Sequence, residues 1–168
     1  MNYNKNDPTP ERTKKERVIE KFEGEHSFLS NFHPCNIDLC NMDDDNAIYP
    51  SVEHAFQAFK TNNAADRETI RTSETAGKAK RLGRRVELKP DWENVKIHVM
   101  TVLVTRKFEN PFLRKLLLDT KETELIEGNE WKDTFWGMCQ GRGQNHLGKI
   151  LMKVRNDIRE EQKREALL

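Results

Sequence analysis

The sequence predicts a single, mostly helical domain with a small sheet of short strands. A chain of 168 residues has the length of one domain and can bury a substantial hydrophobic core. Several long segments repeat apolar residues every three to four positions, as amphipathic helices do, whereas the strand-like runs are short. We expect the folded part to cover residues 18–162, after a polar, disordered segment at 1–17 and before a tail at 163–168.

The first elements are predicted to be extended and short. Residues 27–34 are aromatic and end in a proline, which indicates a strand or a tight loop. Residues 37–39 fit a strand that leads into an acidic turn at 43–46, and a further short strand ends near Tyr49.

A helix is predicted to begin at Ser51, whose hydroxyl suits the N-cap position. Its apolar stripe repeats at i, i+3, i+4 and i+7 and consists of Val52, Ala55, Phe56 and Phe59. On an adjacent face lie Glu53, Gln57 and Lys60. The helix dipole favours an ionised Glu53 in the first turn. A glutamate at this position is also common in helices with no catalytic role.

The rest of the chain is predicted to be mainly helical, with a short strand at 123–127. The predicted helices cover residues 64–71, 73–84, a segment from about 91, a segment opened by Asn110-Pro111, and 146–161. Small residues on the second of these indicate close approach to another backbone. The cations around it form a candidate anion-binding edge or, equally, a solvated surface: Lys78, Arg81, Arg84 and Arg85.

Composition excludes several classes of function. The net charge is only +1, so we do not expect a bulk polyanion binder. The sequence contains no apolar run long enough for a membrane span and no signal peptide, and its three cysteines lack a disulfide framework; we therefore expect a cytoplasmic location. The His and Cys residues near position 35 lack metal-ligand spacing, so we expect no metal.

A second candidate region for function spans residues 131–146. Trp131 and Trp136 in a glycine-rich loop can stack on a planar ring, although either can equally belong to the core. Arg142, between two glycines and just before a helix, is a candidate phosphate contact. Asp133 adds a second carboxylate to that of Glu53. Two carboxylates beside a sugar–base bond are what N-glycoside hydrolysis requires.

These segments together resemble the NADAR family of YbiA-like proteins. The matching stretches are Phe28-Leu29-Ser30-Asn31-Phe32, Tyr49 to Lys60, Ala79 to Arg84, Asp91 to Lys96, and Phe135-Trp136-Gly137 through Gly143 to Gly148. The resemblance implies a small α+β fold, with no metal or organic cofactor. It implies catalytic roles for Glu53, Trp92 and Asp133. From the matching stretches and the loop we expect substrate contacts from Asn31, Phe32, Lys60, Arg81, Trp136 and Arg142.

The resemblance further implies hydrolysis of the N-glycosidic bond between a ribose phosphate and a nitrogenous base. Substrates of the family include riboflavin-biosynthesis intermediates such as 5-amino-6-(5-phosphoribosylamino)uracil, and ADP-ribose attached to guanine in nucleic acid. We therefore expect a small ribosyl phosphate or an ADP-ribose-containing molecule, including ADP-ribosylated nucleic acid, as the partner. The alternative is a non-catalytic module that binds ADP-ribose or another NAD-derived nucleotide.

Overall fold

The computed structural model describes residues 18–40 and 46–168. The predicted N-terminal disorder at 1–17 and most of the acidic turn at 43–46 lie outside these residues. The helices are α1 (Val52–Ala58), α2 (Ala64–Arg71), α3 (Ala76–Gly83), α4 (Trp92–Lys107), α5 (Pro111–Asp119) and α6 (His146–Glu165). The strands are β1 (Val18–Ile19), β2 (Ile37–Asp38), β3 (Ile48–Tyr49), β4 (Glu124–Leu125), β5 (Gly128–Asn129) and β6 (Met138–Cys139).

The fold is α+β and mostly helical, as predicted. In the described residues the strands form separate pairs rather than one small sheet: β1 with β4 in parallel, β2 with β3 antiparallel, and β5 with β6 in parallel. The predicted strand or loop over 27–34 is wrong in its first part, because Gly24–Leu29 forms a 3-10 helix that buries Phe28 and Leu29. Helix α6 extends to Glu165, into the predicted tail.

Most helices begin where a side chain caps their first turn. The Ser51 hydroxyl accepts a hydrogen bond from the backbone N–H of His54, as expected for the cap of α1. Asn63 and Asn110 cap α2 and α5 in the same way, and Pro111 occupies the first turn of α5. Helix α3 begins later than predicted because Thr75 is its cap.

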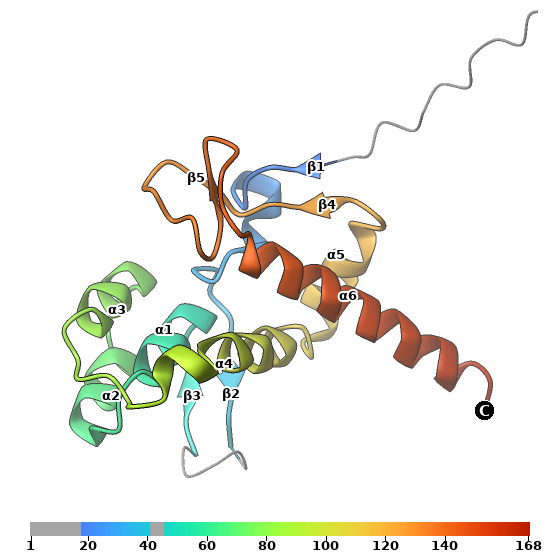
Figure 1. Cartoon of the computed structure of the whole chain (residues 1–168). Helices are drawn as coiled ribbons and strands as arrows, with labels where there is room; N and C mark the ends of the chain where they lie inside the picture. Colours follow the sequence, from blue (N-terminus) through green and yellow to red (C-terminus); the bar gives the residue numbers. More distant parts are fainter. Residues whose placement is uncertain (1–17, 41–45) are drawn as a thin grey trace, which may run out of the picture.

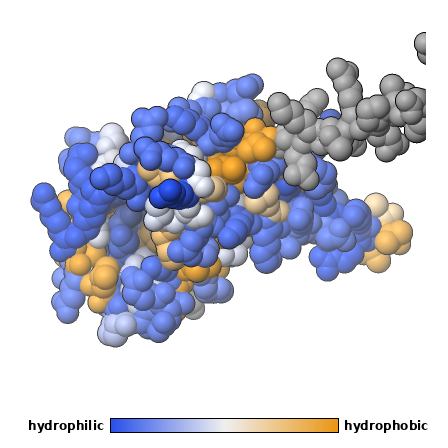
Figure 2. Space-filling view, turned by 45° about the horizontal axis from the view of Figure 1, so that its top comes forward, coloured by the Kyte–Doolittle hydropathy of each residue, from blue (hydrophilic) through white to orange (hydrophobic). Residues whose placement is uncertain are grey.

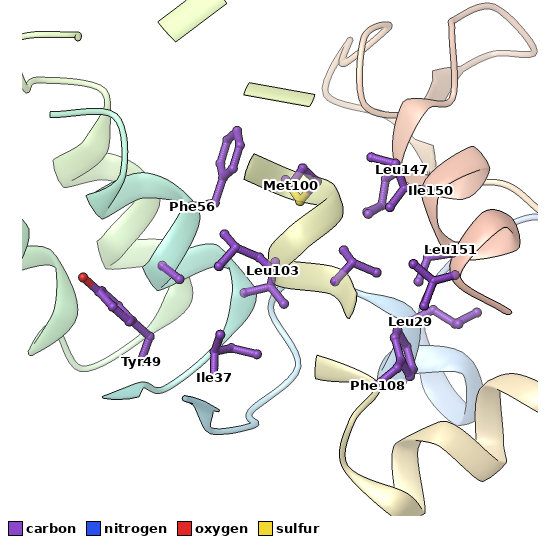
Figure 3. Close-up of a cluster of buried hydrophobic side chains, with 14 of the residues drawn as sticks. Leu29, Ile37, Tyr49, Phe56, Met100, Leu103, Phe108, Leu147, Ile150 and Leu151 are labelled. Carbon is purple, nitrogen blue, oxygen red and sulfur yellow. The ribbon is translucent and has the colours of Figure 1, made fainter. Parts of the chain in front are cut away.

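Helix α4 runs through the middle of the molecule, with α1 and its neighbours α2 and α3 on one side and α6 on the other (Figure 1). Figure 3 shows the core across these layers, from Phe56 on α1 through Met100 and Leu103 on α4 to Leu147 on α6. Every residue of α1 is buried, including its polar ones. The predicted polar face of this helix therefore lies inside the molecule.

The face of the molecule in Figure 2 is largely hydrophilic. Figure 2 shows apolar side chains on this face in separate patches among hydrophilic ones. None of the helices in the described residues combines the length and the apolar character that crossing a bilayer requires.

Candidate active site

A cavity of about 570 Å³ lies between α1, α3, the loop at residues 30–32 and the segment from 127 to 136. Six of the nine predicted site residues line it: Asn31, Phe32, Glu53, Lys60, Asp133 and Trp136. A larger and more open hollow, of about 900 Å³, lies between β1, the 3-10 helix and α5, but none of the predicted site residues lines it. The chemistry-bearing side chains thus converge on the smaller cavity.

Hydrogen bonds hold both the backbone and the side chain of Glu53, on α1. Its backbone N–H donates to the carbonyl of Asn31 at 3.0 Å, which ties α1 to the loop at 30–32. Its Oε1 accepts from Gln57 Nε2 at 2.8 Å, one turn further along the helix. The residue is 5% exposed. Glu53 therefore presents a nearly dry carboxyl to the cavity in a fixed orientation.

Burial raises the pKa of Glu53 above its ordinary value, while the positive charges of Lys80, Lys60 and Arg84 partly oppose the rise. The net shift of this pKa is therefore opposite to the one that the helix dipole alone would produce. A dipole is worth about 0.3–1 kcal/mol at an exposed helix end, and α1 has only seven residues. Desolvation of a fully buried carboxyl is a much larger effect.

Asp133 reaches the cavity from the loop that follows β5. Its Oδ1 accepts hydrogen bonds from the backbone N–H groups of Phe135 at 3.1 Å and Trp136 at 2.9 Å. Asn129 holds the backbone of Asp133 from both sides, by accepting from its N–H at 3.0 Å and donating to its carbonyl at 2.8 Å. Asp133 thus fixes the path of the loop with its carboxyl group and is one of the residues that line the cavity.

The cations of the cavity are Lys60, Lys80 and Arg84. The sequence placed Arg84 among the candidates, but not Lys80, whose Nζ lies 5.5 Å from the centre of the Phe32 ring. Lys80 belongs to the small-residue stripe of α3, and this position between Ala79 and Gly83 was the signal that it faces inward. Arg81 is exposed and does not line the cavity.

Some aromatic residues of the site are exposed at the cavity, and others pack against one another. Phe32 and Trp131 line the cavity with 42% and 59% of their surface exposed, so each offers a face for stacking. Trp136 lies edge-on to Phe56 at 5.3 Å between ring centres. Trp92, predicted as catalytic, is buried and packs on Phe56 at 5.0 Å without lining the cavity.

Arg142 does not line the cavity, and the first N–H groups of α6, which were expected to be free for a phosphate, are paired within the protein. The N–H groups of His146 and Leu147 donate to the carbonyls of Phe135 and Trp136 at 3.2 and 3.0 Å. The side chain of Asn145 also turns inward, where it bonds the backbone of Leu125 and Glu127. The donors that the sequence offered to a phosphate therefore hold the loop in place.

Three buried oxygens of the lining accept no hydrogen bond from any described residue: Asn31 Oδ1, Gln57 Oε1 and Glu127 Oε2. A buried acceptor without a donor costs about 1–3 kcal/mol. Each of these oxygens belongs to a residue that lines the cavity. The described part of the chain contains no group of three or more His, Cys, Asp or Glu side chains that could hold a metal.

Gly83 permits the close approach of α3 to the site. A Cβ atom at this position would come within 2.1 Å of Gln57 Oε1 and 2.7 Å of Gln57 Cβ. We expect Gly83→Ala to lower the free energy of unfolding by about 1–3 kcal/mol through overpacking. We also expect slower catalysis, because Gln57 holds Glu53. Denaturant unfolding and a rate assay would measure both effects.

Gly77→Ala is the matched control on the same helix. A Cβ atom there would meet nothing closer than 3.9 Å, so this change should leave stability equal or slightly higher, as alanine favours helix. Equal stability of the two variants would show that α3 can move away from Gln57 without cost.

Comparisons with known proteins identify the family to which these segments belong. The family model described as NADAR domain matches residues 19–159. A riboflavin biosynthesis protein of Vibrio vulnificus is 39% identical over 139 residues, which are 80% of this chain, but the match spans only 36% of that longer protein. The N-glycosidase YbiA of Escherichia coli is 39% identical over 118 residues, which are 68% of this chain and 73% of the relative.

The fold has a solved counterpart. The NMR structure of Escherichia coli YbiA superposes with a TM-score of 0.73 and 33% sequence identity, covering 89% of this chain and 92% of that chain. The match of the family model extends from β1 into α6 and therefore includes every segment that lines the cavity. The chain belongs to the NADAR domain family.

Proposed function

We propose that this protein is an N-glycosidase that hydrolyses the bond between a ribose phosphate and a nitrogenous base. The observation that carries the proposal is the meeting of Glu53 and Asp133, from segments 80 positions apart in the chain, at one cavity with Lys60, Lys80 and Arg84. The N-glycosidase name of the Escherichia coli relative supports the same reaction class.

The cavity provides what this reaction needs. Cleavage of the bond from C1′ of the ribose to nitrogen builds positive charge on the sugar, which a carboxylate stabilises. Water then adds at C1′. The two carboxyl groups serve these steps, one by facing the developing charge and one by orienting water or the ribose hydroxyls. The side chain of Asn31, which lines the cavity and whose Oδ1 has no partner among the described residues, suits a hydroxyl donor of the sugar.

The remaining parts of the substrate match the other lining groups. The rings of Phe32 and Trp131 offer stacking faces for a planar base. The cations suit the phosphate. A cavity of about 570 Å³ is a common size for a small-molecule site. We take a phosphoribosylated aminopyrimidine as the first candidate substrate, because relatives carry riboflavin biosynthesis names.

A direct assay tests this function. The protein is incubated with 5-amino-6-(5-phosphoribosylamino)uracil and, separately, with DNA that carries ADP-ribose on guanine. Release of ribose 5-phosphate or of ADP-ribose identifies the enzyme and its substrate. Binding of either molecule without release would replace the proposal with the alternative of a non-catalytic ADP-ribose-binding module.

The cations of the cavity should set affinity for the phosphate. We expect Lys80→Ala or Arg84→Ala to weaken binding of a phosphorylated substrate about ten- to a hundredfold, since a charge-assisted contact is worth about 1.5–3 kcal/mol. The loss should shrink for the dephosphorylated nucleoside, because the lost contact is to the phosphate. Calorimetric titration with both ligands measures the ratio.

Arg81→Ala is the informative comparison, because Arg81 lies on the same helix but faces outward. We expect its preference for the phosphorylated ligand to equal that of the wild type. If Arg81→Ala lost more affinity for the phosphorylated ligand than Lys80→Ala, the phosphate would bind at the outer edge of α3 and not in the cavity.

A further inference from the structure

Glu127 is a third carboxyl residue of the cavity, and its backbone is held from several sides. It lies between β4 and β5, where its N–H donates to Asn145 Oδ1 at 3.0 Å. Its carbonyl accepts from the N–H of Met138 at 2.9 Å. Gly137 packs so closely on this carbonyl that a Cβ atom there would come within 2.1 Å of the oxygen. The position of Glu127 is therefore set by two separate segments, around residues 137–138 and at Asn145.

The side chain of Glu127 takes no part in this scaffolding. It lines the cavity, and its Oε2 is buried and accepts no hydrogen bond from any described residue. The charged groups that act on it come from four directions: Glu53 on α1, Lys80 on α3, Lys107 on α4 and Asp133 in the loop after β5. A carboxyl group without a protein partner, on a residue that lines a ligand cavity, is positioned to exchange a proton with that ligand.

The surroundings also keep this carboxyl protonated at unusually high pH. Burial, followed by the negative charge of Asp133, raises the pKa of Glu127 to about 7, although Lys80 opposes the rise. An ordinary glutamic acid has given up its proton well below this pH. At neutral pH a large share of the Glu127 carboxyls thus still carries a proton that can be donated, in the range where acid–base catalysis is effective.

We propose that Glu127 is the general acid that protonates the leaving nitrogen of the base, an inference that rests on the N-glycosidase function proposed above. As the C1′–N bond breaks, its electron pair stays on nitrogen, which receives the proton of the Glu127 carboxyl. Water supplies the oxygen that bonds to C1′. The second proton of that water returns to the Glu127 carboxylate, so that the products are the free base and the ribose phosphate.

The experiment compares Glu127→Gln with the control Glu130→Gln on an N-ribosyl phosphate whose base leaves poorly. Glu130 lies three positions further along the same segment, is exposed and pairs with Lys21 at 3.2 Å. We expect Glu127→Gln to lose about a hundredfold or more in kcat, the usual effect of a positioned acid. Glu130→Gln should keep the wild-type rate. Thermal melts establish that both variants are folded.

A leaving group that needs no proton separates acid catalysis from a general loss of the site. For 4-nitrophenyl ribofuranoside 5-phosphate, we expect Glu127→Gln to stay within about threefold of wild type, because nitrophenolate departs without protonation. An equal loss on both substrates would mean that Glu127 only shapes the cavity and would overturn its role as the acid.

The pH profile of the wild-type protein gives a test that needs no variant. Since the protonated form is the active one, kcat for the N-riboside should fall about tenfold per pH unit above pH 7. The profile for the nitrophenyl substrate should lack this fall. If the wild type cleaves the N-riboside but its kcat shows no such fall above pH 7, the role of Glu127 is contradicted and the proposed function is not. A wild type that cleaves no N-riboside contradicts the proposed function and, with it, this role.

Discussion

Glu53→Gln is expected to lower the rate of N-glycoside hydrolysis by at least about a hundredfold while the protein stays folded. A positioned acid–base or charge-stabilising carboxyl contributes on this scale. The amide keeps the shape of the side chain and can still accept from Gln57 Nε2, so the contact between the two residues on α1 should survive. Steady-state kinetics and circular dichroism measure the two parts of this expectation.

The same variant should alter how stability depends on pH. Because burial raises the pKa of Glu53 in the folded state, folding favours the protonated form. The contribution of Glu53 to the stability of the wild type is fully present below the ordinary carboxyl pKa. It is lost as pH rises through the higher folded-state pKa. Glu53→Gln removes that loss, so we expect the stability of the variant, relative to that of the wild type, to increase as pH rises.

Glu68→Gln is the control for both measurements, since Glu68 lies exposed on α2 and pairs with Arg71. It should keep the wild-type rate. If Glu53→Gln also kept the full rate on a substrate that the wild type cleaves, Glu53 would have no place in the mechanism.

Trp92→Ala is expected to produce the largest loss of stability among the changes considered. The indole is 4% exposed and packs on the ring of Phe56. Truncation of a buried tryptophan costs about 3–5 kcal/mol. In a chain of 168 residues this corresponds to a melting temperature lower by roughly 6–20 °C. Calorimetry would measure the shift.

Trp92→Phe distinguishes a core residue from a catalytic one. Because the structure places Trp92 behind Phe56 rather than in the cavity lining, we expect this variant to bind and turn over substrate nearly as the wild type does. Its loss of stability should be smaller than that of Trp92→Ala, since the new ring still fills part of the space. A variant that melts normally but loses affinity would place Trp92 at the substrate, as the family resemblance implies.

Much of the secondary structure could be predicted because its signals are local. Asn63 caps α2 and Asn110 caps α5 through bonds to N–H groups two and three positions ahead, so the cause of each boundary lies within one turn of sequence. The 3-10 helix at Gly24–Leu29 could not be predicted in this way. Its aromatic residue is typical of a strand, and only the packing of Phe28 and Leu29 into the core determines its backbone conformation.

For the candidate site, the sequence by itself determined which residue types share a face of α1 and that a second carboxylate follows in the loop near residue 133. Only the tertiary structure decided which groups meet. It brought Lys80 and Glu127 to the cavity and left Arg81 and Arg142 outside it. It also set the direction of the Glu53 pKa shift against the expected effect of the α1 dipole, because burial depends on every segment packed around a side chain. The local sequence of α1 contains the dipole but not the burial, and burial is the larger effect.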